Sequence, residues 1–410
     1  MRLPSRCSTL PPSALTVVVV MLASGCAHRA RPTTEPTRLE EMHITARPDA
    51  GGFATEAVDA ESLFRAGVAA QRHERFVDAL TAYDRVADEF PASRFVAPSL
   101  YNAGLSGKAL GRPADAAERF ERLVVARPGS PDVRPARFQL AELYLELERG
   151  EDGLAVADVL LGDEGLDPDE RVEAMARKAQ QLLAQGRVED AAAQAQTTMS
   201  WARTRRDEEA VRDVYFVAAA NYVWAETLRL EAEGIVPPPG GVAVQRPYLE
   251  RRAQVILRAQ RAYFDVIRHT HPDWAAAAGY RIGQLYDAFW DAIMSAPVPP
   301  PQRPLPAEHL PVYETEYRLY LARLVKPLIR HSIRYWELTL VMVERTGVES
   351  DWTARIRVDL DRARDRLLVQ PEGPEGLDAT RQGPEITSDL PEQPGDEVSA
   401  PAASAASEPG

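Results

Sequence analysis

The sequence predicts an all-α fold: an α-solenoid of helical hairpins followed by longer helices. The chain matches itself at a step of 37 residues over 60–160. Apolar residues recur three and four positions apart over 58–368, and proline or glycine marks the breaks between these stretches. A fixed step of this length indicates stacked units that each bury a face against their neighbours, rather than one globular core.

Residues 1–25 have the features of a secretory signal peptide. Arg2 and Arg6 make the start positive, and the apolar run 14–22 is far shorter than the roughly 20 residues that span a bilayer. The run ends in Leu22-Ala23-Ser24-Gly25-Cys26, which resembles the lipobox of bacterial lipoproteins, although Ala23 replaces the usual larger aliphatic residue. The resemblance implies cleavage before Cys26 and lipidation of Cys26 with acyl chains such as palmitate. The alternative is an ordinary cleaved signal followed by an incidental cysteine.

Composition limits the kinds of chemistry and partner. The 410 residues carry a net charge of −13, which argues against nucleic acid as a partner. Cys7 and Cys26 are the two cysteines, and Cys7 belongs to the predicted signal. A disulfide within the mature chain and a cysteine metal site are therefore excluded. Stability has to come from packing.

Two segments are expected to stay outside the folded body. Residues 26–57 hold the lipidated cysteine and read as a flexible linker, with a short strand possible at 41–47, where apolar residues alternate. Residues 371–410 contain seven prolines and nine acidic residues against one arginine. Such a segment buries too little apolar surface to offset its ordering entropy, so we expect a disordered acidic, proline-rich tail.

Repeat units are expected over 58–204. Small, aromatic and proline positions recur at the 37-residue step, and a fourth copy follows after 38 residues. The marks are Gly67, Gly104 and Ala141; Ala79, Ala116 and Gly153; Tyr83 and Phe120; Pro91 and Pro128; and, in the fourth copy, Ala179 and Ala191.

The marks predict how each hairpin packs. Tight turns are expected at 110–112 and 185–187, and Gly104 is expected to face Ala116 so that two backbones approach closely. Phe120 would fill the space one turn further along, and Pro128 would end the second helix. The third copy lacks that proline and has Gly153 where alanine is usual, which predicts a looser junction there.

The segment from Leu100 to Pro128, with its Gly, Ala, aromatic and Pro marks, resembles the tetratricopeptide repeat (TPR), whose usual period is ~34. The three extra residues, with Pro91-Ala92-Ser93 and Pro128-Gly129-Ser130, resemble the periplasmic branch of that family. That branch includes the barrel-assembly lipoprotein and the coordinator of cell-wall synthesis with outer-membrane constriction. The resemblance implies TPR-like hairpins whose first helices line a protein-binding groove.

The range 205–370 is predicted to be a helical domain of longer helices. Residues 252–268 and 276–294 fit the second and first helices of degenerate repeats, whereas a non-repeat helical cap explains them about as well. One long helix is expected over 311–344, with a possible kink at Pro327, and a terminal helix over 351–368.

Residues typical of catalysis are scarce. His269-Thr270-His271 is the one close histidine pair, and Pro272 follows it, so a helix end explains the pair better than a metal site. The sequence holds no glycine-rich phosphate loop, nucleophile elbow or His-Glu-x-x-His motif. We expect neither enzymatic activity nor a bound cofactor or metal.

The candidate partner-binding residues come from the repeat. Phe64, Tyr101 and Phe138 are 37 residues apart on successive first helices, and Val68 and Leu105 lie one turn further on. The TPR resemblance places these positions on the groove. Packing of the three rings between neighbouring units is an equally open interpretation.

Together these observations predict a lipid-anchored protein at the periplasmic face of the outer membrane that acts as a TPR scaffold for a protein or peptide partner. Ala27 after the cysteine, rather than aspartate, favours the outer membrane by the sorting rule of the lipoproteins that the sequence resembles. Two alternatives are a subunit of an envelope assembly machine and a helical accessory to cell-wall metabolism.

Overall fold

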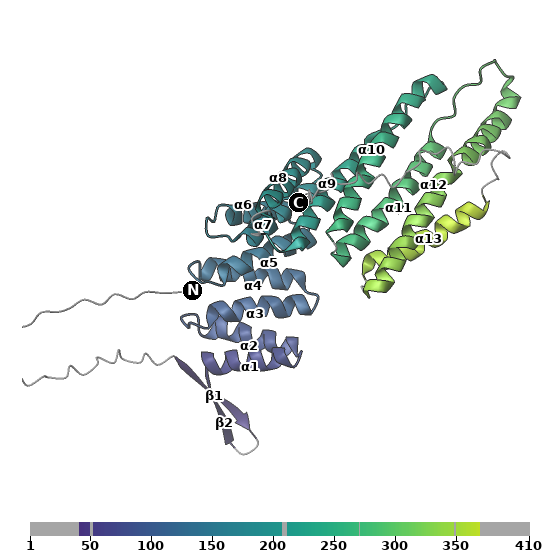
Figure 1. Ribbon diagram of the computed structural model, residues 1–410. Helices are drawn as coiled ribbons and strands as arrows, with labels where there is room; N and C mark the ends of the chain where they lie inside the picture. Colours follow the sequence, from purple (N-terminus) through teal and green to yellow (C-terminus); the bar gives the residue numbers. More distant parts are fainter. Residues whose placement is uncertain (1–40, 50–51, 207–210, 270, 348–349, 370–410) are drawn as a thin grey trace, which may run out of the picture. The chain divides into compact units, whose positions relative to one another are not determined.

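The structure is a computed structural model that describes residues 41–49, 52–206, 211–269, 271–347 and 350–369 (Figure 1). Thirteen α-helices and two strands occur in these ranges. The chain divides into two compact units, residues 1–57 and 58–410. The predicted signal peptide, Cys26 and the tail 371–410 lie outside the described residues.

The first unit contains a two-stranded sheet. Strands β1 (Met42–Asp49) and β2 (Gly52–Asp59) are neighbours in it, and β2 runs two residues past the boundary between the units. The strand expected at 41–47 is present. A second strand, β2, was not predicted, because residues 26–57 were expected to form a flexible linker. Pairing explains the difference, because a strand too short to be stable alone gains a ladder of backbone hydrogen bonds from its neighbour.

Four helical hairpins begin the part of the chain from residue 58 onward, and each of them is one repeat unit. They are α1 (Ala60–Arg72) with α2 (Phe76–Glu89), α3 (Val96–Ala109) with α4 (Pro113–Ala126), α5 (Val133–Glu146) with α6 (Gly150–Leu161), and α7 (Pro168–Ala184) with α8 (Val188–Arg206). Helices α2, α4 and α6 begin 37 residues apart, and each helix packs against the next along the chain. The predicted TPR-like solenoid is therefore confirmed as a fold.

The turns inside the four hairpins share one backbone conformation. Glu74, Gly111, Glu148 and Gly186 all have a positive φ, between 56° and 72°. The following amide N–H donates to the carbonyl five residues back, as from Arg112 to Gly107 at 3.0 Å. This bond satisfies carbonyls at the helix end and fixes the reversal. The tight turns predicted at 110–112 and 185–187 are confirmed, and two glutamates hold the same conformation in the other units.

Close approach of the paired helices depends on glycine beneath an aromatic ring. A Cβ on Gly104 would lie 2.5 Å from the Phe120 ring, and one on Gly67 would lie 2.6 Å from the Tyr83 ring. The expected pairing of Gly104 with Ala116 is wrong: Gly107 lies against Ala116, at 3.2 Å for an added Cβ. The ring occupies the space one turn earlier, because Phe120 lies one turn beyond Ala116 on the antiparallel helix. The remaining marks agree, since Pro91 and Pro128 follow the ends of α2 and α4.

The junction after the third unit is filled rather than loose. A Cβ on Gly153 would lie 2.4 Å from the amide of Gln181, which is 1% exposed. The Gln181 amide donates to the Ala141 carbonyl at 2.9 Å. Glycine at 153 therefore makes room for a side chain of the next unit, and this corrects the looser junction that we expected. In the fourth unit Ala179 and Ala191 are fully buried, as predicted.

Longer helices follow. They are α9 (Val214–Gly234), α10 (Val242–Arg268), α11 (Pro272–Ser295), α12 (Leu310–Thr346) and α13 (Asp351–Val369), with a short 3₁₀ turn at Ala307–His309. A Cβ on Gly283 of α11 would lie 2.3 Å from the ring of Trp336 on α12. This contact repeats the glycine and ring arrangement of the hairpins, so it favours degenerate repeats over an unrelated cap for α11 and α12.

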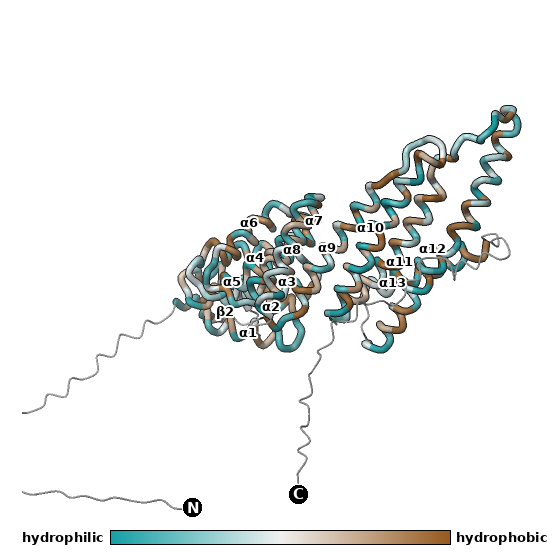
Figure 2. The backbone as a smooth tube through the Cα atoms, turned by 45° about the horizontal axis from the view of Figure 1, so that its top comes forward, coloured by the Kyte–Doolittle hydropathy of each residue, from teal (hydrophilic) through white to brown (hydrophobic). Residues whose placement is uncertain are grey.

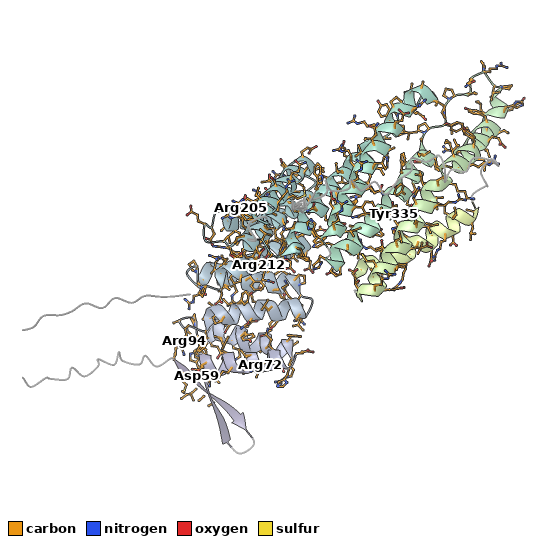
Figure 3. The ribbon with its side chains drawn as sticks, viewed as in Figure 1. Asp59, Arg72, Arg94, Arg205, Arg212 and Tyr335 are labelled. Atoms are coloured by element: carbon orange, nitrogen blue, oxygen red, sulfur yellow. The ribbon has the colours of Figure 1, made fainter. Side chains whose placement is uncertain are left out.

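Hydrophobic and hydrophilic residues alternate along the helices (Figure 2). Capping defines the first helix, because the Asp59 carboxylate accepts from the Ser62 N–H at 2.7 Å just before α1 (Figure 3). Within the described ranges, no helix combines the length and hydropathy needed to cross a bilayer.

Candidate functional site

The odd-numbered helices are the first helices of the hairpins, and they lie next to one another from unit to unit. Helix α5 contacts α7, α7 contacts α9, and α9 contacts α11. We call the surface that these helices form the first-helix face. A side chain on one of them can therefore reach its neighbour in the next unit, which the sequence does not show directly.

The predicted aromatic positions pack both within their own hairpins and against the following hairpin. The Phe64 ring stacks on Phe95 at 5.2 Å between centroids, and the Tyr101 ring meets Phe120 edge-on at 5.6 Å. Phe138 is 8% exposed and lies in a cluster with Leu160. Phe64 and Tyr101 stay half-exposed, so both keep some ring surface for a partner. Their contribution to binding remains a prediction.

Val68 and Leu105 are also half-buried. Val68 packs against the cluster that holds Tyr83, and Leu105 against the one that holds Phe120. At the corresponding position of the third unit stands Glu142, which changes the surface from apolar to polar. The first-helix face therefore differs between its early and its middle units.

A polar ladder crosses the middle units, and it consists of Lys108, Gln139, Glu142, Glu173 and Arg177. The Lys108 ammonium donates to Gln139 Oε1 at 2.6 Å and to Glu142 Oε1 at 2.9 Å. Arg177 Nη2 donates to Glu142 Oε2 at 3.1 Å and to Glu173 Oε1 at 3.5 Å. The ladder joins α3, α5 and α7, so it links three consecutive units through paired charges.

Burial affects the carboxylate at the end of the ladder. Desolvation raises the pKa of Glu173, and the adjacent Arg177 guanidinium opposes that rise. The Arg177 side chain is 11% exposed, and its Nε has no hydrogen-bond partner among the described residues. The ladder thus has one buried donor available for an acceptor from outside.

An aromatic cluster adjoins the ladder on α9 and α11, and it consists of Tyr215, Phe216, Tyr222, His271 and Trp274. The Tyr215 ring lies 4.9 Å from Phe216, 4.7 Å from His271 and 5.5 Å from Trp274. The Arg177 guanidinium lies 5.1 Å from the Phe216 ring centroid, which connects the cluster to the ladder. Burial raises the pKa of Tyr215, and its hydroxyl is within electrostatic reach of Arg177 and Glu142.

The cluster holds polar atoms without partners. In the described part of the chain, Trp274 Nε1 and His271 Nδ1 are buried and make no hydrogen bond. An indole N–H can only donate, so it needs an acceptor such as a carbonyl oxygen. A buried donor left unpaired costs about 1–3 kcal/mol, and an incoming acceptor would recover that cost. This arrangement suits a ligand that presents backbone carbonyls beside apolar groups.

The histidine pair has the structural role that was predicted. His269 follows the end of α10 and His271 precedes α11, while Thr270 lies outside the described residues. His269 Nε2 lies 3.3 Å from the Asn221 amide. Among the residues that the structure covers, no group of three or more histidine, cysteine or acidic side chains could hold a metal ion.

Neither the ladder nor the cluster was predicted from the sequence. Glu142 lies 37 residues after Leu105, so a polar residue replaces an apolar one at the same repeat position. This replacement was the one signal for the ladder in the sequence. Lys108 and Arg177 occupy other positions in their units, so the step does not connect them. The cluster joins residues about 60 positions apart in a region without a clear repeat.

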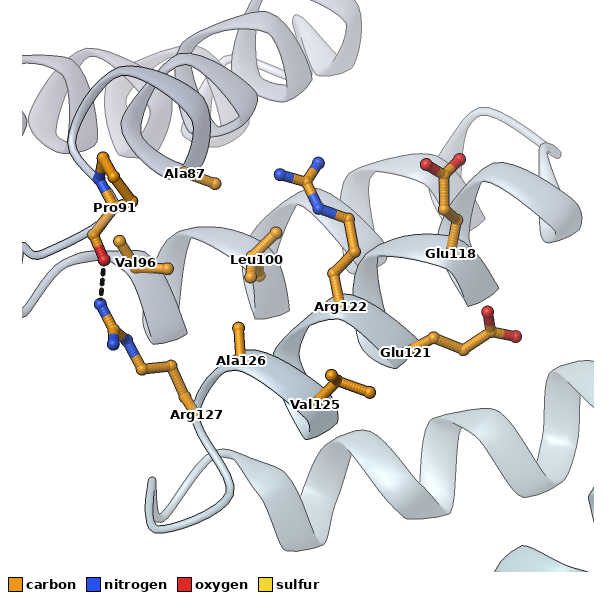
Figure 4. Close-up of a pocket in the computed structure, with 10 residues that line it drawn as sticks. All are labelled: Ala87, Pro91, Val96, Leu100, Glu118, Glu121, Arg122, Val125, Ala126 and Arg127. Atoms are coloured by element: carbon orange, nitrogen blue, oxygen red, sulfur yellow. Dashed lines mark hydrogen bonds between the residues drawn. The ribbon is translucent and has the colours of Figure 1, made fainter.

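A pocket lies between the first hairpin, α1–α2, and the second, α3–α4. Its volume is about 550 Å³, and it has an apolar floor at Ala87, Val96 and Leu100 and charged residues at its rim (Figure 4). The rim charges already have partners, because Arg122 pairs with Asp88 at 2.6 Å and Arg127 donates to the Pro91 carbonyl. With its charges paired internally, this pocket offers less to a ligand than the aromatic cluster.

Comparison with known proteins finds similar structures but no sequence family. No protein-family model and no curated protein sequence matches the chain. A tetratricopeptide repeat protein from Parabacteroides merdae is similar at a TM-score of 0.36 and 12% identity, over 74% of this chain and 98% of that one. A putative kinesin light chain with nearly identical TPR-like repeats from Podosopora anserina has a TM-score of 0.33 and 14% identity, over 49% and 96%. At such values we take no function from these proteins.

Proposed function

We propose that this protein is a non-catalytic scaffold that binds an extended segment of a partner protein on its first-helix face. The observation that carries the proposal is the aromatic cluster beside the polar ladder. Trp274 and Arg177 each hold a buried donor without an acceptor there. An extended peptide presents carbonyl acceptors at regular intervals, and its side chains can pack on the rings of Tyr215 and Phe216.

The ladder would hold the helices of this face in a fixed arrangement. Its charges pair with one another from Lys108 through Glu142 to Arg177, so they join α3, α5 and α7 beside the cluster. Half-exposed Tyr101 and Phe64 extend the same face toward the first unit. Aromatic and arginine side chains are the residues that most often dominate such interfaces.

We also propose that the scaffold is anchored by acyl chains on Cys26 at the periplasmic face of the outer membrane. The support is the sequence Leu22-Ala23-Ser24-Gly25-Cys26 and the alanine that follows it. Two or more acyl chains hold a protein stably at a membrane, whereas one does so marginally. Labelling with radioactive palmitate tests this: Cys26→Ser should lose the label, and equal label on both forms contradicts it.

Capture of partners tests the binding site. The anchored protein is purified from membranes after mild solubilisation, and the proteins that co-purify are compared between the wild type and variants. Trp274→Phe and Arg177→Gln should reduce specific partners by about tenfold, because each removes a free donor. The matched control Arg122→Gln lies at the pocket on α4 and should leave capture unchanged.

The identity of the captured partner distinguishes the two alternative roles. An outer-membrane barrel protein as the main partner favours an envelope assembly machine, and a cell-wall enzyme favours an accessory role in cell-wall metabolism. Capture that survives both Trp274→Phe and Arg177→Gln, in variants with unchanged melting temperature, contradicts a binding site at the cluster.

A further inference from the structure

The first half of α12 carries an apolar stripe that is partly buried at its start and exposed at its end. Tyr313, Tyr317, Tyr320 and Leu324 are spaced four, three and four residues apart, so they lie along one side of the helix. Tyr320 is 53% exposed and Leu324 is 43% exposed. The α12 side chains that join the hydrophobic core clusters begin at Leu328.

This half of α12 is nevertheless held in place. Its start follows the connection from α11 (Figure 1), and the Tyr313 hydroxyl donates to the Pro299 carbonyl at 2.9 Å. The Arg318 guanidinium donates to the Met294 carbonyl. The stripe is therefore presented on a fixed helix, and neighbouring rings along it lie 6.2 Å and 6.5 Å apart.

The spacing of the stripe is the same in both directions. Because its spacings are four, three and four, two copies placed antiparallel bring Tyr313 opposite Leu324 and Tyr317 opposite Tyr320. Antiparallel helices pack such stripes side by side, with axes about 8–10 Å apart. A two-fold symmetric contact brings the same surface of both copies together, and this spacing lets all four side chains of one stripe face those of the other.

The flanking charges fit the same register. In the antiparallel pair, exposed Glu314 of one copy stands opposite exposed Arg323 of the other, and the symmetry makes the contact twice. Within one helix these two residues are nine positions apart, or about 13 Å along the axis, so they do not pair with each other. Neither residue has an ion pair among the described residues.

We propose that this stripe is a self-association surface, on which a second copy of the chain docks through antiparallel pairing of the first halves of the two α12 helices. The contact is small compared with obligate dimers, so dissociation is expected in the micromolar range. It involves neither the polar ladder nor the aromatic cluster, and both stay available to a partner.

Sedimentation velocity from about 1 to 200 μM tests the proposal on the chain from residue 27 onward, which keeps every described residue and has no cysteine. The wild type should convert from monomer to dimer over this range. Tyr320→Glu should abolish the dimer without lowering the melting temperature, since Tyr320 is exposed. A wild type that stays monomeric throughout overturns the proposal.

A charge exchange tests the register. Arg323→Glu places like charges opposite each other twice, and Glu314→Arg does the same, so each should weaken the dimer by about tenfold. The double variant Glu314→Arg with Arg323→Glu restores opposite charges and should return to near wild-type affinity. Arg330→Glu makes the same charge change seven residues away and should have little effect.

Two further results would overturn the antiparallel pairing. One is a dimer that neither single exchange weakens, and the other is a double variant that remains as weak as the singles. A monomeric chain that binds phospholipid vesicles through Tyr320 would assign the stripe to a membrane instead of to a second copy.

Discussion

The hairpins α1–α8 and the longer helices α9–α13 use different means to fix which helices pack together. In the hairpins, small residues lie under rings at a constant step, and many ion pairs outside the polar ladder are solvent-exposed, as between Arg122 and Asp88. In the longer helices the step is lost and buried polar networks appear. Where the repeat no longer determines which helices pack together, buried ion pairs between particular residues determine it instead.

The network around Glu226 is the clearest case. This carboxylate is 6% exposed and accepts from Tyr263 at 2.5 Å, while Arg229 and Arg281 lie at 2.9 Å and 2.8 Å. It thereby joins α9, α10 and α11. Asp287 plays a similar part between α11 and α13, since burial raises its pKa and the ion pair with Arg366, at 2.6 Å, opposes the rise.

The largest expected effect is the loss of that buried carboxylate. Glu226→Ala removes the buried carboxylate that Arg229, Arg281 and the Tyr263 hydroxyl share, which should cost about 3–5 kcal/mol of unfolding free energy. The hairpin control is Asp88→Ala, which removes the exposed partner of Arg122 and should cost about 0–1 kcal/mol. Urea unfolding followed by circular dichroism measures both. Equal losses would mean that the two regions do not differ in this respect.

The next effect belongs to the hairpins. Ala116 is fully buried, and Gly107 of the paired helix is in contact with it. Ala116→Leu forces bulk between two backbones and should cost about 1–3 kcal/mol. Because neighbouring units share interfaces, hydrogen exchange should accelerate first in α1–α6 and later in α9–α13. Uniform acceleration up to Val369 would show that both regions unfold as one.

The sequence was sufficient to predict the hairpins, because the residues that pack their helices together recur every 37 residues. It predicted the turns at Gly111 and Gly186 and the helix ends before Pro91 and Pro128. The step did not reveal contacts between different repeat positions. The contact of the Gln181 amide with Gly153, between two hairpins, and that of Gly107 with Ala116, within one hairpin, were both missed.

Proline positions were less reliable guides in the longer helices. Prolines were expected to mark breaks between helical stretches, whereas Pro247 lies inside α10, which begins at Val242. In the first turn of a helix the backbone N–H groups have no partner within the helix, so a proline there costs nothing. Further along, a proline removes one backbone hydrogen bond, and the neighbouring turns can still hold the helix. A proline alone therefore does not determine where a helix begins. The helices expected at 311–344 and 351–368 agree with α12 and α13.

A smaller effect compares turns across the two regions. Gly111 in the hairpins and Gly347 after α12 have φ of 66° and 68°, and a Cβ at either would meet no atom within 4 Å. Gly111→Ala and Gly347→Ala should therefore each cost about 1 kcal/mol for backbone conformation alone. The reverse change Glu148→Gly should stabilise by a similar amount, since Glu148 has φ of 56°. Thermal melting measures all three, and a stabilising Gly111→Ala would contradict the shared turn.

The smallest effect depends on pH and concerns the end of the polar ladder. Burial raises the pKa of Glu173 above the ordinary value of 4.5. The folded carboxyl therefore keeps its proton to a higher pH than the unfolded one. Between the two pKa values the folded state binds more protons, so the stability contributed by this group falls as pH rises through that window.

Glu173→Gln removes this dependence. The melting temperature of the variant relative to wild type should therefore increase as the pH rises from about 4 to 7. Glu151→Gln, at an exposed carboxylate on α6, serves as the control and should show a flat difference. A difference for Glu173→Gln that is flat, or that falls toward neutral pH, would mean that the ion pair with Arg177 outweighs desolvation. The ladder would then stabilise the middle units like the surface pairs of the hairpins, and Arg177 would be less available to a partner than its unpaired Nε indicates.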